Sequence, residues 1–531
     1  MKLSAFQSWK KNTCNALLSS LLPIKSTVSL DGTLIREGAL VERVARYVLQ
    51  VFKFFGLLPV AVACHLAARV ERWFYPVADS SLTEFAKRPT WEVGEDGKER
   101  DVSLPRVLTG FATADFHDHG PLARPHTNFG ELYLKKFPDR FDPSSKFPDM
   151  WNNPETYLNL LKETGAKVFR FSIPRDQIEP EEGRFDEAQI QAVSKWCEQL
   201  KKAGIEPIAT LEHNAHPLYQ TLATVEGRGS FVRYAQRIGV CLKECGVTKI
   251  VTFNEVGVEG FQGHIMGEFP PYRSVDFEGA AKNFTHLMQT HNAVYDALKE
   301  IDPHFQIGCS HDPIRFRPYH KYNPLWSPIE RLVAWVLTSV NHTMVMDAMR
   351  KGIVKLKIPG LINYEFDLGG PVKFDVSYLQ YYSDPLVKLS FFGGDSVSRV
   401  KDEKTTAYRF RMYPQGMASA LEEMASLGKP IVISEVGLDT GVNKGDDDHE
   451  RIQYLNRISQ VVKKALDEGI NIQAVCYWTL TDNFDWVHGW TLPVPCPIRF
   501  GMYRFDYSTG EIAPRGAAFW FMRKRQQEAL S

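Results

Sequence analysis

The stretch VTFNEVG (251–257) is an apolar strand pattern that ends on a carboxylate, and IVISEVG (431–437) repeats the arrangement later in the chain. A strand followed at once by Glu255 or Glu435 is difficult to explain as core, because burying an unpaired charge costs several kcal/mol. In a parallel barrel, all strands end on one face, and such barrels carry their chemistry there. If both strands belong to one barrel, the two carboxylates converge.

The chain on either side of these two strands alternates apolar strands with helical stretches. Near-continuous apolar strands are expected when both faces of a sheet are covered. Gly165, Gly204, Gly246 and Gly428 stand just before predicted strands, where they would end helices. This pattern predicts an α/β fold, the eight-stranded (β/α)8 TIM barrel. The predicted strands are 105–113, 167–173, 205–211, 248–254, 306–311, 372–379, 430–435 and 472–480, and the predicted helices are 182–203, 231–245, 279–300, 413–427 and 448–468.

Composition excludes several classes of function. The 531 residues include 63 basic and 63 acidic side chains, so there is no bulk electrostatic case for a nucleic-acid partner. The 8 cysteines show no CxxC pair, which favours free thiols in a reducing compartment over a metal site or disulfides. No glycine-rich phosphate loop is present, so we expect neither a nucleotide nor an organic cofactor. The run His117, Asp118 and His119 has no distant third ligand, so we expect no metal either.

The region before the barrel has a different character, and we divide the chain into a segment 1–104 and a catalytic barrel 105–531. Within 38–73, helical periodicity leads into FFGLLPVAVACHLAA (54–68), which has no formal charge but is shorter than the roughly 20 residues of a membrane span. A helical lid on the barrel, an interfacial membrane anchor and a span all remain open. We expect no cleaved signal peptide and a cytoplasmic or peripheral-membrane location.

Motifs along the predicted barrel resemble glycoside hydrolase family 1, the retaining β-glycosidases, over about residues 107–520. Each motif alone is weak evidence, but their common order, with a glutamate at both matching strand ends, is specific. The matching motifs are TGFATADFH (109–117), VFRFSI (168–173), TLEHNAHP (210–217), TFNEV (252–256), ISEVG (433–437), YWTLTDNFDWVHGW (477–490) and RFGMYRFDY (499–507).

The resemblance implies roles for the carboxylates and their neighbours. Glu435 matches the nucleophile and Glu255 the general acid, which later acts as base, in a double displacement that needs carboxyls about 5–5.5 Å apart. Arg170 is similar to the arginine that pairs with the nucleophile and would lower the pKa of Glu435. Tyr382 matches the tyrosine that hydrogen-bonds the same carboxylate. The charge of Glu435 would then raise the pKa of Glu255.

A second set of residues matches the family's sugar-binding positions. Asn254 would bind the 2-hydroxyl, His213 the neighbouring hydroxyl, and Trp478 the apolar face of the ring. The positions expected at the far hydroxyls are His117, Asp485 and Trp486.

Departures from the family pattern leave the identity of the sugar open. His117 stands in place of glutamine, and Asp485 is one methylene shorter than the usual glutamate. Misplaced hydrogen bonds discriminate between sugars more strongly than one methylene does. The remaining departures are Asn214 for tryptophan, Gln380 for asparagine, Val256 for proline and Val436 for asparagine.

Three functions are therefore weighed. The first is a retaining β-glycosidase, an O-glycosyl hydrolase that cleaves a β-glucoside or β-galactoside. The second is a membrane-associated transglycosylase moving galactosyl groups between glycolipids, because GFATADFH and CSHDPIRFRPYHK (309–321) are similar to a divergent galactolipid galactosyltransferase branch. The third is a catalytically silent carbohydrate-binding barrel. The expected partner is a carbohydrate or glycolipid, with 38–73 as a possible membrane contact.

Overall fold

The computed structural model describes residues 101–118, 124–137, 146–320, 326–388, 406, 410–441, 448–487 and 498–530. Its contacts divide the chain into a larger unit (85–315, 336–385 and 403–531) and a smaller one (1–84, 316–335 and 386–402). The segment 38–73 lies outside the described residues, so its role as lid, anchor or span stays a prediction. The division of the chain at residue 104 stays a prediction for the same reason.

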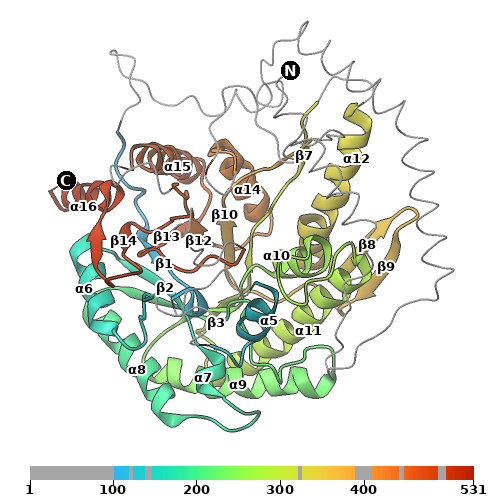
Figure 1. Ribbon diagram of the computed structural model, residues 1–531, viewed down its shortest axis with the longest axis horizontal. Helices are drawn as coiled ribbons and strands as arrows, with labels where there is room; N and C mark the ends of the chain where they lie inside the picture. Colours follow the sequence, from blue (N-terminus) through green and yellow to red (C-terminus); the bar gives the residue numbers. More distant parts are fainter. Residues whose placement is uncertain are drawn as a thin grey trace, which may run out of the picture. The chain divides into compact units, whose positions relative to one another are not determined.

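A parallel sheet in the larger unit closes into a barrel (Figure 1). Its strand order is β5-β4-β3-β2-β1-β13-β12-β10-β6. The strands β5 and β6 stand at the two ends of this order, yet they are two parts of one stretch interrupted at Cys309, so the sheet closes on itself. The predicted barrel is thus confirmed. The strands are β1 (Leu108–Ala112), β2 (Val168–Ser172), β3 (Glu206–Glu212), β4 (Lys249–Phe253), β5 (Gln306–Gly308), β6 (Ser310–His311), β10 (Ser377–Tyr381), β12 (Ile431–Val436) and β13 (Ile472–Trp478).

One predicted strand is displaced. Residues 372–379 carry an apolar alternation, but β10 begins only at Ser377. Val372, Phe374 and Val376 are buried nevertheless. The apolar alternation therefore indicates that this segment is buried where it approaches the barrel. Burial begins several residues before the strand pairing of β10.

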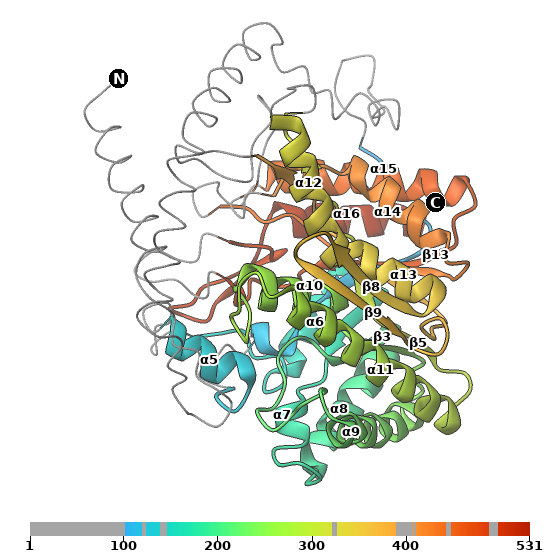
Figure 2. The ribbon, with the colours of Figure 1, turned by 90° about the vertical axis from the view of Figure 1, so that its right-hand side faces the viewer.

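Helices of the larger unit lie outside the strands (Figure 1). In Figure 2, α9 and α11 lie side by side, and their close approach requires a small residue. A Cβ on Gly239 of α9 would lie only 2.5 Å from Cδ2 of Leu298 on α11. The helices of this unit are α5 (Asn128–Lys136), α6 (Pro154–Thr164), α7 (Arg175–Ile178), α8 (Glu187–Lys202), α9 (Val225–Glu244), α10 (Val256–Gly260), the π-helix η2 (Phe261–Met266), α11 (Phe277–Ile301), the π-helix η3 (Ser339–Thr343), α13 (Met344–Lys351), α14 (Gln415–Ala425), α15 (His449–Asp467) and α16 (Gly516–Leu530).

Other elements were not predicted. The antiparallel hairpin of β8 (Ile353–Ile358) and β9 (Ile362–Asp367) follows α13. A second antiparallel pair joins β14 (Tyr503–Phe505) to β15 (Ile512–Pro514). Helix α12 covers Trp326–Thr338, and in the smaller unit β7 (Arg317–Pro318) pairs with β11 (Leu386–Val387).

Helix ends follow the local chemistry of the sequence. The Asp186 side chain accepts the backbone N–H groups of Ala188 and Gln189 at the start of α8, which satisfies donors that the helix leaves unpaired. The four glycines predicted to end helices all adopt positive φ, between 66° and 72°, a conformation that costs glycine little. The short turn that follows each of these glycines leads the chain into the next strand.

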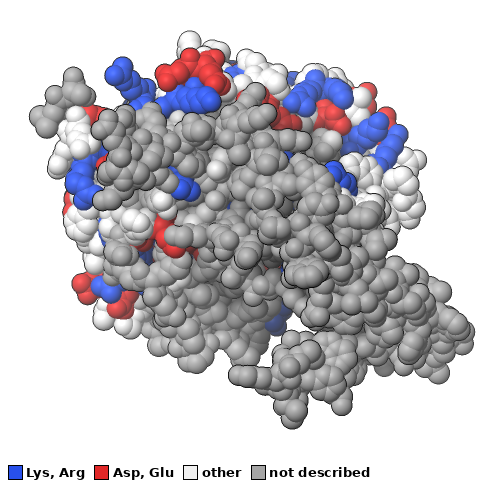
Figure 3. Space-filling model, turned by 90° about the horizontal axis from the view of Figure 1, so that it is seen from above, with Lys and Arg blue, Asp and Glu red and all other residues white. Residues whose placement is uncertain are grey.

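The described surface shows no single-sign patch in Figure 3, where basic and acidic side chains alternate over the part that is coloured. This distribution agrees with the balanced charge of the sequence. Within the described ranges, no helix is both long and apolar enough to cross a membrane.

Candidate active site

Glu435 lies near the carboxyl end of β12 and is only 3% exposed. Its two carboxylate oxygens have different partners. Arg170 Nη1 donates to Oε1 at 2.5 Å, and the Tyr382 hydroxyl donates to Oε2 at 2.6 Å. Arg170 and Tyr382 are the two partners of Glu435 that the family resemblance of the sequence implied. The carboxylate is thereby fixed in one orientation before any substrate binds.

Arg170 connects this carboxylate to the next layer of the site. It lies on β2, is fully buried, and its Nε donates to the Thr210 hydroxyl at 3.0 Å. Its Nη2 donates to Oδ1 of Asn254 at 2.6 Å. A planar guanidinium with several fixed donors orients two partners at once, which an ammonium group could not do as well.

The Asn254 amide is held by an unusual number of donors. Besides Arg170, the Gln380 amide donates to Asn254 Oδ1 at 2.8 Å and the Ser310 hydroxyl donates to it at 3.1 Å. Oδ1 is therefore saturated, and the orientation of the amide is settled. Nδ2 is buried and has no hydrogen-bond partner among the described residues, so it is the donor left for another molecule.

Glu255 follows β4 in a left-handed backbone conformation, with φ of 47° and ψ of 53°. Its backbone N–H donates to the Ser310 hydroxyl at 3.0 Å. Asn214, after β3, is likewise left-handed with φ of 62°. Such backbone conformations are disfavoured for residues with a Cβ, and they cluster where a fold must aim a side chain.

The pKa values of the two glutamates are both raised, but for different reasons. Burial raises the pKa of Glu435, and Arg170, Tyr382 and Gln380 each act to lower it. The expected lowering by Arg170 is thus confirmed, but removal of the carboxylate from water outweighs it and leaves the pKa of Glu435 raised. The pKa of Glu255 lies well above its usual value, through burial first and then the charge of Glu435. The predicted effect of the Glu435 charge, which raises the pKa of the neighbouring acid Glu255, is thus confirmed.

Four aromatic rings form a second cluster beside these carboxylates. The ring centroid of His117 lies 4.2 Å from that of Trp486 and 5.2 Å from that of Trp478. His213 lies 6.0 Å from Trp478, and its Nε2 is 3.9 Å from Oε1 of Glu435. The structure therefore brings four of the predicted sugar-binding residues together from three separate segments.

Both histidines are neutral near neutral pH. Burial lowers the pKa of His117 to about 3, and both of its ring nitrogens are buried without a hydrogen-bond partner in the described part of the chain. Burial and the charge of Arg170 lower the pKa of His213 well below its usual value. Its Nδ1 is hydrogen-bonded to the Ser172 hydroxyl at 2.9 Å. Neutral imidazoles can both donate and accept, as sugar hydroxyls do.

Asp485 directly precedes Trp486 of this cluster. Its Oδ1 accepts the backbone N–H of Val487 at 3.0 Å, which orders the turn after β13. A Cβ on Gly437 would lie 2.3 Å from the carbonyl oxygen of Trp478. Glycine at this position allows the ends of β12 and β13 to approach closely.

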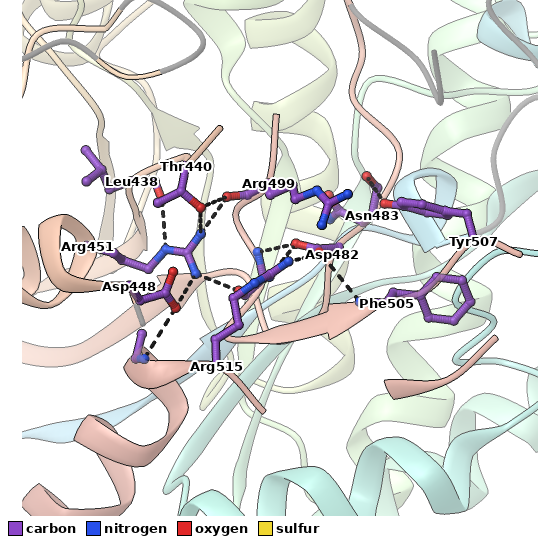
Figure 4. A network of polar contacts seen from close by, with 12 residues as sticks. Leu438, Thr440, Asp448, Arg451, Asp482, Asn483, Arg499, Phe505, Tyr507 and Arg515 are labelled. Atoms are coloured by element: carbon purple, nitrogen blue, oxygen red, sulfur yellow. Dashed lines mark hydrogen bonds and ion pairs between the residues drawn. The ribbon is translucent and has the colours of Figure 1, made fainter. Parts of the chain in front are cut away.

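Two buried arginines hold the segment that follows Trp478 (Figure 4). Arg515 forms a two-pronged ion pair with Asp482, at 2.9 Å and 2.6 Å. Arg451 donates to Asp448 at 2.9 Å, and both arginines donate to the carbonyl oxygen of Gly501. Paired hydrogen bonds of this kind fix a loop more firmly than apolar packing alone.

Several residues of the site were not singled out from the sequence. Ser172 and Ser310 lie within or beside predicted strands and orient His213, Asn254 and Glu255. Asp312 comes directly after β6, is 5% exposed, and is close enough to Glu255 to raise its pKa. Its position after a strand is the same signal that identified the two glutamates.

Metal-ligand clusters of three or more histidine, cysteine or acidic side chains are absent from the described residues. Five described cysteines are free thiols, in agreement with the prediction from their spacing; they are Cys197, Cys241, Cys245, Cys309 and Cys476.

Comparison with known proteins places this geometry in context. Among curated proteins, the chain is 25% identical over 453 residues to a 6-phospho-beta-galactosidase of Clostridium acetobutylicum, covering 75% of this chain and 91% of that protein. It is 26% identical over 401 residues to beta-glucosidase A of Acetivibrio thermocellus, covering 70% and 86%.

Solved structures match the barrel as well. A beta-glycosidase from Pyrococcus horikoshii superposes with a TM-score of 0.67 at 22% identity, covering 80% of this chain and 96% of that one. A beta-glucosidase from Thermotoga maritima in complex with deoxynojirimycin gives 0.67 at 24% identity, covering 80% and 98%.

The fold and site thus define a glycoside hydrolase, built on a (β/α)8 barrel with two carboxylates at the strand ends. The sequence model of glycosyl hydrolase family 1 matches residues 146–528. The chain belongs to this family.

Proposed function

We propose that this enzyme cleaves β-glucosides or β-galactosides, with Glu435 as nucleophile and Glu255 as acid and base. The observation that supports this assignment is the asymmetry of the pair. Glu435 receives hydrogen bonds from Arg170 and Tyr382, whereas Glu255 has the pKa that is raised further. One carboxyl is suited to stay ionised and the other to keep its proton.

The reaction follows from these protonation states. Glu435 attacks the anomeric carbon while Glu255 gives its proton to the departing oxygen, which forms a glycosyl ester and a neutral alcohol. The ester removes the charge of Glu435, so the pKa of Glu255 falls. Glu255 then takes a proton from water as the water attacks the anomeric carbon, and Glu435 is released as carboxylate.

Sugar binding is assigned to the groups that the site leaves unpaired. Asn254 Nδ2 would donate to the 2-hydroxyl, a bond that strengthens in the transition state. His213 would bind the neighbouring hydroxyl, and Trp478 would lie against the apolar face of the ring. We assign the far hydroxyls to His117, Asp485 and Trp486.

Replacement of the proposed acid should make activity depend on the leaving group. For Glu255→Gln, we expect kcat/KM to fall by roughly 10²–10⁴ on an alkyl or unactivated aryl β-glycoside, because no proton reaches the departing oxygen. On a dinitrophenyl β-glycoside, whose leaving group needs no proton, the first step should proceed at nearly the wild-type rate. Steady-state and burst kinetics on the two substrates measure the difference.

Glu259→Gln serves as the matched control. Glu259 lies one turn further along α10, is buried enough to have its pKa raised to about 7, and accepts a hydrogen bond from Asn283. Its variant should keep the wild-type dependence on leaving group. Equal losses on both substrates in Glu255→Gln would contradict the assignment.

Transfer of the glycosyl group to a sugar hydroxyl uses the same covalent intermediate as hydrolysis. A transglycosylase with a galactolipid acceptor is therefore the alternative function, and the resemblance of the segment 309–321 to the galactolipid galactosyltransferase branch supports it. The two outcomes separate in product analysis on β-galactolipid vesicles. Free sugar alone would exclude the transferase, and oligogalactolipid alone would exclude the hydrolase.

Co-sedimentation with the same vesicles, before and after deletion of 38–73, tests the membrane contact. A fluorosugar that labels Glu435 would exclude the silent barrel.

A further inference from the structure

We propose that Gln380 is a further sugar-binding residue, whose side-chain oxygen Oε1 accepts the proton of the 2-hydroxyl while Asn254 Nδ2 donates to the oxygen of that same hydroxyl. The inference rests on the proposed function and deepens it, because it adds a residue that selects glycosides with a free 2-hydroxyl. Gln380 stands where the family pattern has asparagine, so this contact does not follow from the family resemblance.

The sheet brings the Gln380 side chain to both the nucleophile and the Asn254 amide. Gln380 lies on β10, and the parallel ladder pairs it with Glu435 on β12, so the two side chains leave the sheet next to each other on the same face. From there the Gln380 side chain reaches the residue that directly follows β4, where its Nε2 donates to Asn254 Oδ1 at 2.8 Å. The amide of Gln380 is thus in direct contact with the amide assigned to the 2-hydroxyl.

The orientation of both amides is fixed by chemistry. The Arg170 guanidinium can only donate, so the Asn254 atom that faces its Nη2 at 2.6 Å must be the oxygen Oδ1. The Gln380 atom that faces the same oxygen must then be the donor Nε2. Neither amide can be flipped without a clash of two donors or two acceptors. The oxygen Oε1 of Gln380 and the nitrogen Nδ2 of Asn254 therefore lie outside the bond that joins the two amides.

These two remaining atoms have no hydrogen-bond partner among the described residues. Gln380 is 0% exposed and Asn254 is 1% exposed, and a buried polar atom without a hydrogen bond costs free energy. One of the two atoms is an acceptor and the other is a donor. A hydroxyl group donates one hydrogen bond and accepts others, so a single sugar hydroxyl can satisfy both atoms.

The other contacts of Asn254 strengthen its free donor. Its Oδ1 accepts from the charged Arg170 as well as from Gln380, and the Ser310 hydroxyl, which itself accepts the Glu255 N–H, directs its proton to the same oxygen. Hydrogen bonds in such a chain polarise one another, so the Nδ2–H group of Asn254 becomes a stronger donor. A hydroxyl that accepts from this group then donates more strongly to Gln380. A sugar that lacks the hydroxyl leaves two buried atoms unpaired, which a site of this kind rejects.

Paired substrates with and without the hydroxyl test the proposal. In the full-length chain, we compare kcat/KM on a nitrophenyl β-glycoside with kcat/KM on its 2-deoxy counterpart. Gln380→Met, which has a similar length and no amide oxygen, should reduce the preference for the hydroxylated substrate by about tenfold. The different intrinsic reactivity of the two sugars cancels when two enzymes are compared. Equal losses on both substrates would leave the preference unchanged and would overturn the proposal.

Two control variants separate a contact with the sugar from support of Asn254. Ser310→Ala also removes a donor from Asn254 Oδ1 but leaves Gln380 Oε1 in place, so the preference should fall less than in Gln380→Met. Equal reductions in the two variants would show that Gln380 acts only through Asn254. Ser434→Ala removes a hydrogen bond of 3.2 Å to the carbonyl oxygen of Leu379, the residue before Gln380, and should keep the wild-type preference. A reduction there as large as in Gln380→Met would also overturn the proposal.

A measurement on the wild type covers the case in which Gln380→Met does not fold. A 2-deoxy-2-fluoro iminosugar can accept from Asn254 but cannot donate to Gln380, so it should bind at least about tenfold more weakly than the parent iminosugar with its 2-hydroxyl. Equal affinities would overturn the proposal. A wild-type chain that cleaves no aryl β-glycoside would refute the proposed function itself, whereas an active wild type with an unchanged preference in the variant refutes only the role of Gln380.

Discussion

Glu435→Ala should lose on the order of 10⁴-fold or more in kcat on any β-glycoside, since removal of a nucleophile ends the covalent route. The loss should be the same for good and poor leaving groups, unlike that of the Glu255 variant, because no ester can form. Azide should restore part of the rate. It would occupy the space of the missing carboxylate and attack the anomeric carbon from that side, so the product should be the α-glycosyl azide.

The matched variant is Glu255→Ala with the same azide. There the ester still forms on Glu435, azide attacks in the second step, and the product should be the β-glycosyl azide. Proton NMR of the anomeric hydrogen distinguishes the two products. Identical azide anomers from the two variants would show that the roles are assigned wrongly.

Arg170→Met should be the most damaging change outside the two carboxylates. It leaves Glu435 buried without its cation, a situation that destabilises a fold by about 3–5 kcal/mol. Arg170 lowers the pKa of Glu435, so its removal raises that pKa further and the acid limb of kcat/KM should move to higher pH. A glutamate with a raised pKa in the folded state destabilises the protein above its unfolded pKa. The stability deficit should therefore be full above the folded-state pKa, shrink as pH falls toward the unfolded-state pKa of about 4.3, and be absent below it.

Arg515→Met provides the control for this variant. Arg515 is equally buried and forms the two-pronged pair with Asp482, so its loss should also destabilise the fold. Neither Arg515 nor Asp482 is among the groups with the largest effects on the pKa of Glu435, so the acid limb should stay in place. Urea unfolding and the pH profile of each variant separate a general loss of stability from an effect on the nucleophile. Equal acid limbs in Arg170→Met and the wild type would contradict the proposed coupling.

Much of the site was predictable because its main residues end strands. Glu255 and Glu435 lie at or just beyond the carboxyl end of an apolar strand, and the barrel topology brings such ends together. Arg170, in contrast, lies in the middle of β2 and reaches Glu435 through its long side chain. Ser310, which contacts Glu255 and Asn254, and Ser172, which contacts His213, were missed, since a small hydroxyl within a strand carries no local signal of what it will contact.

The errors have physical causes as well. The sequence did not show that the pKa of Glu435 is raised despite Arg170, because the depth of burial depends on the whole barrel, whereas the arginine is visible in one motif. Asp312 was overlooked although it follows a predicted strand. The hairpin of β8 and β9 could have been predicted from the alternation in IVKLKI (353–358) and the Pro-Gly turn that follows it.

The interruption at Cys309 gives the barrel a seam. Each of the other barrel strands has at least five residues, whereas β5 has three and β6 two, and β6 pairs with β10 at only two positions. Local unfolding on heating should therefore begin at this join. Hydrogen–deuterium exchange should detect it as early deuteration of the backbone amides of β5 and β6. The same join supplies the Ser310 hydroxyl that steadies the acid. Warming would then erode turnover before the molecule as a whole comes apart.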